Sequence, residues 1–137
     1  DFAAATPFEF AELASASKLL SGFGIEAGAI MRTLKMLGDI ASGTSTDIKG
    51  LAMIFGQVSA AGRLMREDMN QLTERGVPIL QALADHFGVA KDAVRGMVEA
   101  GKVSFKDFSA AMESLTADGG KFHGMMEKQG QTLHGLF

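Results

Sequence analysis

Residues 61–69, AGRLMREDM, and residues 100–108, AGKVSFKDF, are two copies of one nine-residue pattern that decides the fold. Each copy follows an amphipathic stretch and leads into another. A glycine in the left-handed conformation ends helices at low cost, so Gly62 and Gly101 are predicted to stop the helices before them. No third copy is present, so the pattern is a duplicated junction and not a solenoid repeat.

The residues after each glycine predict how the junction continues. Leu64 and Val103 each stand two positions beyond the glycine, where an apolar side chain packs back on the helix that has ended. Asp68 and Asp107 then fall in the first turn of the next helix, where a negative charge complements the helix dipole. The pattern therefore predicts a helix–glycine–helix junction, used twice.

The rest of the chain has helical periodicity, and no alternating strand pattern of useful length occurs. The predicted fold class is all-α, a compact bundle of about six to eight short helices broken by Gly-rich turns. Six of the predicted helices cover approximately residues 7–20, 26–41, 48–61, 67–75, 78–87 and 90–100. Another helix follows the second junction and ends at residues 118–120. The last stretch carries Phe122, Met126 and Leu133.

Helix ends carry recognisable signals. Thr6-Pro7-Phe8-Glu9 has the form of a capping box with proline at the first helical position. The segment 42–47 is predicted to be a loop ending in a cap. Four glycines are predicted to act as structural helix caps: Gly62, Gly76, Gly88 and Gly101. By contrast, Gly56 and Gly96 lie inside predicted helices, where alanine should be tolerated if no helix packs against them.

Composition limits the class of protein. The chain has 137 residues, 47% of them hydrophobic and 21% charged. These values favour one globular domain, residues 1–137, and Asp1 in place of an initiator Met predicts an excised piece of a much longer protein. The net charge of −3 gives no electrostatic case for nucleic acid or an anionic membrane. The longest uncharged run, Gly50 to Gly62, has 13 residues against the roughly 20 needed to cross a bilayer, so no stable membrane insertion is expected.

No motif predicts a catalytic, cofactor or metal site, and an enzyme is not expected. The absence of cysteine excludes disulfides and thiol chemistry. Residues 22–27 fit G-x-G-x-x-A, but a predicted helix precedes them where a dinucleotide site needs a strand, so a linker turn is favoured. The histidines lack metal-ligand spacing and are predicted to be helix-surface or partly buried residues: His86, His123 and His134.

Residues 83–94 form a helix-turn-helix pattern. Ala84 would allow close helix approach, Gly88 would form the turn, and Val89 and Val94 would lock the second helix. Lys91 and Arg95 are the candidate DNA contacts on that helix, but acidic residues accompany them and no base-reading Asn or Gln is present. Packing is therefore favoured over nucleic-acid binding, which stays as the alternative function.

Taken in order, the segments resemble the tape measure domain near the N-terminal part of phage and prophage tail length tape measure proteins. The resemblance extends over nearly the whole chain, departs from the family pattern at Gly130, and rests on these pieces: TPFEF (6–10), LGDIA (37–41), FGQV (55–58), GRL (62–64), EDMNQL (67–72), RGVPI (75–79), GKVSF (101–105), GGKF (119–122), MM (125–126) and TLHG (132–135).

This resemblance implies a non-enzymatic structural role in tail assembly and tail length determination. The implied partners are tail tube subunits, tail assembly chaperones and tail tip or baseplate proteins, with a homo-oligomer also compatible. The implied location is the virion tail, and the host bacterial cytoplasm during assembly. An injected domain acting at the host membrane is compatible with the family, although no basic amphipathic stripe supports it.

Overall fold

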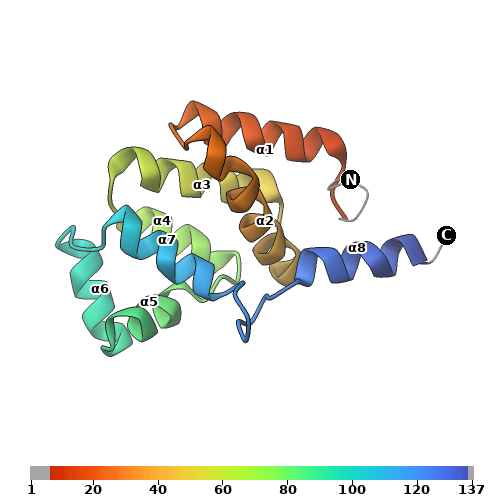
Figure 1. Cartoon of the computed structure of the whole chain (residues 1–137). Coiled ribbons are helices and arrows are strands. Elements are labelled where there is room, and N and C mark those ends of the chain that lie inside the picture. The colour runs from red at the N-terminus through yellow and green to blue at the C-terminus, as the bar shows by residue number, and fades with distance from the viewer. Residues whose placement is uncertain (1–6, 136–137) are drawn as a thin grey trace.

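The computed structural model describes residues 7–135, with side chains described up to residue 130. This part of the chain is all-α and contains eight helices joined by short turns (Figure 1). The helices are α1 (Phe10–Gly22), α2 (Ala27–Thr44), α3 (Ile48–Ala61), α4 (Arg66–Glu74), α5 (Ile79–Phe87), α6 (Lys91–Glu99), α7 (Phe105–Ser114) and α8 (Met125–Gly135).

Helix α3 is the shared element of the bundle. It packs against α1 and α2 on one side and against α4 and α7 on the other, while α5 packs against α4, α6 and α7 (Figure 1). An apolar cluster runs through both groups, from Leu13 on α1 through Phe55 on α3 to Phe108 on α7. Burial of this cluster, and not helix propensity alone, stabilises helices as short as nine residues.

Helix α1 begins later than the capping-box prediction placed it. Glu9 is the N-cap, and its backbone N–H donates to Oε1 of Glu12 at 3.0 Å. Phe8, just before the cap, packs against the core that contains Leu13, as in a hydrophobic staple. The predicted start at Pro7 is therefore wrong, because Glu9 is the N-cap and Glu12 completes the capping box. Thr6 lies outside the described residues.

Helix α2 runs three residues beyond the predicted stop at Ala41, so the prediction of a loop from residue 42 is wrong. The helix ends at Thr44, whose hydroxyl donates to the carbonyl of Ile40 at 2.7 Å, and Ser45 follows with a φ of 56°. Gly43 stays helical because its missing side chain makes room for the ring of Phe122.

The predicted cap of α3 is confirmed, since Oδ2 of Asp47 accepts the N–H of Gly50 at 2.7 Å. Oδ1 of the same carboxylate lies 2.9 Å from Nη1 of Arg75 and ties the end of α4 to the start of α3. This ion pair, followed by the N–H of Gly50, lowers the pKa of Asp47 despite some desolvation.

The last helix starts later than predicted. Phe122 is buried but lies in the turn before α8, which begins at Met125 after Gly124 turns the chain with a φ of 66°. The helix continues through Gly130 without a break.

The two glycines expected to tolerate alanine have different surroundings. A Cβ added at Gly56 would come within 2.7 Å of Cγ and 3.0 Å of Cβ of Phe23, whereas a Cβ at Gly96 would meet nothing within 4 Å. The condition attached to the prediction therefore fails at Gly56, because the turn after α1 packs directly on α3.

We expect Gly56→Ala to lower the free energy of unfolding by about 1–3 kcal/mol, since the atoms it meets are close to the backbone and cannot swing away. Gly96→Ala should be neutral or raise the stability by up to about 1 kcal/mol, because alanine has the higher helix propensity and its Cβ meets no other atom. Urea denaturation of the two variants measures both effects, and equal stabilities would show that Phe23 does not pack on Gly56.

Candidate functional site: paired junctions and an adjoining pocket

The two copies of the nine-residue pattern lie against each other. The N–H of Leu64 donates to the carbonyl of Val103 at 2.9 Å, and the N–H of Phe105 donates to the carbonyl of Gly62 at 3.0 Å. Between them, Arg63 and Ser104 form an isolated antiparallel bridge. The two copies of the junction are therefore paired through main-chain hydrogen bonds, which the separate reading of each copy did not predict.

The two junctions use their glycines in the same way. Gly62 follows α3 with a φ of 79°, and Gly101 follows α6 with a φ of 70°. Leu64 and Val103, two positions on, are both fully buried. Glycine at each position avoids the penalty that a Cβ meets in the left-handed region. The other two glycines predicted as caps also have positive φ, 88° at Gly76 and 69° at Gly88.

We expect Gly62→Val and Gly101→Val each to lower the free energy of unfolding by at least about 1 kcal/mol, because valine is strained at positive φ. Gly28→Val is the matched control, since Gly28 has no positive φ and a Cβ there would make only an ordinary contact of 3.6 Å with Glu26. Chemical denaturation gives the three values. Junction variants as stable as the control would contradict the capping role.

The carboxylates at the two helix starts have different environments. Asp68 is buried and accepts the N–H of Met65 at 3.2 Å, and desolvation raises its pKa. Asp107 lies at the equivalent position of α7, where Ser104 is the N-cap and its Oγ accepts the N–H of Asp107 at 3.1 Å. The second copy therefore has a hydroxyl cap where the first has a methionine.

His86 joins the second junction to α5. Its Nε2 lies 3.0 Å from Oδ1 of Asp107, and Oγ of Ser104 donates to Oδ2 of the same carboxylate at 2.9 Å. The imidazole, followed by the hydroxyl, lowers the pKa of Asp107. A depressed acid pKa adds stability above the ordinary pKa of an aspartate, and this is lost as the pH falls through the depressed value. The carboxylate lies between the serine and the histidine, so this is not the nucleophile–base–acid order of a hydrolase triad.

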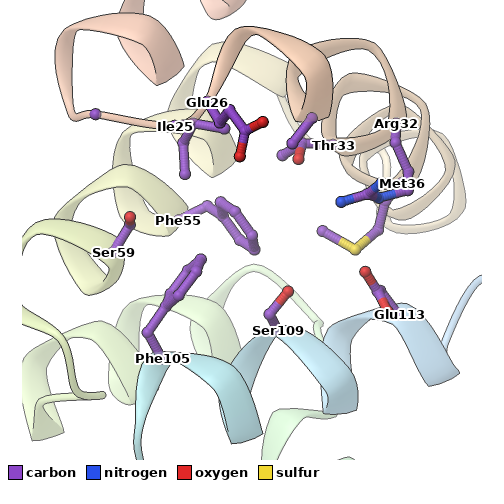
Figure 2. A pocket seen from close by; sticks show the side chains of 12 residues that line it. Ile25, Glu26, Arg32, Thr33, Met36, Phe55, Ser59, Phe105, Ser109 and Glu113 are labelled. Atoms are coloured by element: carbon purple, nitrogen blue, oxygen red, sulfur yellow. The ribbon is translucent and has the colours of Figure 1, made fainter.

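A pocket of about 240 Å³ opens beside the junctions, between α2, α3 and α7 (Figure 2). Phe55 and Phe105 form its apolar wall, with ring centroids 5.2 Å apart and an edge-to-face angle of 72°. The polar residues around it come from all three sides: Glu26, Arg32, Thr33, Ser59, Ser109 and Glu113. Sequence reasoning missed this pocket because its lining residues are distributed over separate helices.

The pocket is small and its rim carries charges of both signs. Its volume lies below the roughly 300–1,000 Å³ of ordinary ligand sites, and its rim mixes two carboxylates with one guanidinium. Among the described residues, no group of three or more His, Cys, Asp or Glu residues could hold a metal ion. An apolar wall with a polar rim occurs both in ligand pockets and in protein interfaces.

The helix-turn-helix segment packs largely as predicted. Ala84 and Val94 are buried, and Gly88 makes the turn. The prediction for Val89 is wrong: its side chain is 40% exposed, because its backbone N–H, which donates to the carbonyl of Ala84 at 3.0 Å, closes the turn. Lys91 and Arg95 are exposed on α6.

The surroundings of these two basic residues weaken the case for nucleic acid. Nε of Arg95 lies 4.0 Å from Oδ1 of Asp92, and Glu99 at the end of α6 lies 3.7 Å from Nη1 of Arg66. The exposed face of α6 therefore carries both signs of charge, where a reader of the major groove presents basic and amide side chains.

Within residues 7–135, none of the helices has both the length and the apolar character that a bilayer span requires. The described part thus combines an all-α bundle, a pair of hydrogen-bonded junctions and a small amphipathic pocket. These features define an all-helical domain of short, tightly packed helices.

The particular family follows from comparison with known proteins. The chain matches the family described as Tape measure protein over residues 1–137. It belongs to this family, and its role is that of a structural protein of the phage tail. No curated protein and no solved structure matches it.

Proposed function

We propose that these residues form one domain of a tape measure protein that acts in tail assembly and in the determination of tail length, without catalysing a reaction. The family match over the whole chain is the observation that carries this proposal. The proposed partners are tail tube subunits, tail assembly chaperones and tail tip or baseplate proteins. The domain would meet them in the host cytoplasm during assembly and in the finished virion tail.

The fold supports a docking role for this part of the protein. As one continuous helix the chain would extend about 200 Å at 1.5 Å per residue, but its turns fold it into a bundle of short helices. A bundle with a buried core presents a fixed surface to partners, whereas an extended ruler needs an unfolded or continuous-helix segment. We therefore assign contact with assembly partners, and not the measuring length itself, to residues 1–137.

The test is complementation of a phage or prophage whose tape measure gene is inactivated. Ser59→Gln and Ser109→Gln fill the pocket between α2, α3 and α7, and Ala60→Gln, one residue from Ser59 and exposed, is the matched control. Circular dichroism melting first establishes that each variant is folded. Electron microscopy then gives the number and length of tails.

We expect folded pocket variants to give few or abnormal tails, while Ala60→Gln gives tails of normal number and length. Normal tails from a gene in which this domain is unfolded would overturn the proposed function. The double variant Lys91→Ala, Arg95→Ala addresses the nucleic-acid alternative. It should assemble normal tails, and purified wild-type domain should show no binding to duplex DNA that survives physiological salt.

A further inference from the structure

Helix α8 is attached to the bundle differently from the other helices. Among the described helices, α2 is the one with which it makes extensive contact, and Figure 1 shows it extending to one side of the body formed by α3 to α7. The chain reaches it through a turn that contains Gly119, Gly120 and Gly124. Its docking therefore depends on one face of α2.

That face is built from small residues. A Cβ at Gly38 would meet Cε of Met126 at 3.2 Å, and a Cβ at Gly43 would meet Cε1 of Phe122 at 2.8 Å, so both side chains lie directly on the α2 backbone. Nε2 of Gln129 also donates to the carbonyl of Ser42 at 2.8 Å. Gly38 and Gly43, the second of which was predicted to lie in a loop, therefore form the surface of α2 on which α8 and the turn before it pack, referred to below as the seat of α8.

Asp39 lies in the middle of this seat and is only 7% exposed. Its Oδ1 accepts the N–H of Met126 in the first turn of α8 at 2.9 Å. No Lys, Arg or His among the described residues lies within ion-pair distance of it. Desolvation raises the pKa of Asp39, although backbone N–H groups of Met126 and Gly124, and more distant charges on Lys35 and His123, act in the opposite direction.

The other charged groups around this carboxylate do not neutralise it. The groove between α2, α7 and α8 brings together residues of both signs: Arg32, Lys35, Asp39, Glu113, His123 and Glu127. Nε2 of His123 lies 3.4 Å from Oδ1 of Asp118, a second carboxylate. The seat of α8 therefore contains an ionised group whose burial is incompletely compensated.

We propose that residues 122–130 form a latch on α2 that opens independently of the rest of the bundle, and that the negative charge of Asp39 keeps this latch near the point of opening. Opening returns the carboxylate to water, where its ionised form is most stable. Asp39 binds a proton more tightly in the docked state than in the open state, because burial raises its pKa in the docked state. Docking therefore strengthens as the pH falls toward and through the raised pKa of Asp39, and weakens as the pH rises.

Amide hydrogen exchange of the whole chain tests the proposal, with residues 122–130 compared with α3. Asp39→Asn keeps an oxygen that can accept the N–H of Met126 and removes the charge, so exchange in residues 122–130 should become severalfold slower. Asp39→Ala removes the acceptor, so exchange there should become faster. Asp92→Asn, a fully exposed carboxylate on α6, controls for net charge and should change nothing.

Two results would overturn the latch. Faster exchange in Asp39→Asn would mean that the charge holds α8 in place. Equal changes in α3 and in residues 122–130 would mean that α8 does not open separately. A pH series in a His123→Asn background, corrected for intrinsic exchange, should show protection of residues 122–130 increasing toward acid pH in the presence of Asp39 and a flat profile once Asp39→Asn is added.

Discussion

Replacing Phe108 with alanine is expected to lower the free energy of unfolding by about 3–5 kcal/mol, the usual range for removing a buried aromatic side chain. Phe108 is fully buried on α7. Its ring centroid lies 5.7 Å from that of Phe55 on α3 and 6.5 Å from that of Phe105. The substitution removes one of the two α7 rings that pack on Phe55 of the shared helix and leaves a cavity in the core. Chemical denaturation monitored by circular dichroism measures the loss.

Phe10→Ala is the matched control for this prediction. Phe10 lies at the start of α1 and is 75% exposed, so its truncation should change the stability by no more than about 0.5 kcal/mol. If Phe108→Ala cost less than about 1 kcal/mol, the aromatic cluster would not hold α3 and α7 together. Such a result would also remove the structural basis of the neighbouring pocket, whose wall contains two of the three rings.

Helix type and most helix ends could be predicted from the sequence because their causes are local. Asp47 caps α3 through a bond to a residue three positions away, and Gly88 ends α5 through its own backbone conformation. The start of α1 was misplaced because Glu9 and Glu12 form a cap that competes with the one anticipated at Thr6. The sequence offers two capping signals of similar strength, one at Thr6 and one at Glu9. The packing of Phe8 on the core favours the cap at Glu9.

Glycine inside helices was the main source of error because one residue type serves two purposes. The sequence predicts a loop at Gly43, and tolerance of alanine at Gly56 provided that no helix packs there. Both are places where an aromatic ring from elsewhere in the chain lies on the helix backbone. The contacting residues, Phe122 and Phe23, come from other parts of the chain, so the sequence of the helix itself does not predict these contacts.

The candidate site could be predicted only in its parts. The duplicated pattern identified both junctions and the acidic residue in each following turn. Their pairing depends on backbone hydrogen bonds between residues 62–64 and 103–105. Because every residue type can form such main-chain bonds, the sequence does not predict them. The seat of α8 is similar, since Asp39 and Met126 are 87 positions apart.

The pairing of the junctions leads to a second large effect. Leu64→Ala should lower the free energy of unfolding by about 2–5 kcal/mol, because Leu64 is fully buried in the core. Val103→Ala should cost less, because valine loses one carbon atom fewer than leucine when it is truncated to alanine. In the antiparallel pair centred on Arg63 and Ser104, Leu64 and Val103 lie directly opposite each other, so their side chains share one face.

Because the two side chains are neighbours across the pair, their effects should not add. After the first truncation opens a cavity, the second removes groups that have already lost part of their packing, so the double variant should cost less than the sum by about 0.5 kcal/mol or more. Leu64→Ala combined with Ala60→Gln, which changes an exposed side chain on α3, should be additive within about 0.3–0.5 kcal/mol. Additivity in both cycles would mean that the two junctions are stabilised separately, each by its own helices. Coupling confined to the Leu64–Val103 cycle would mean that the duplicated sequence works as a single structural unit, in which each copy completes the packing of the other.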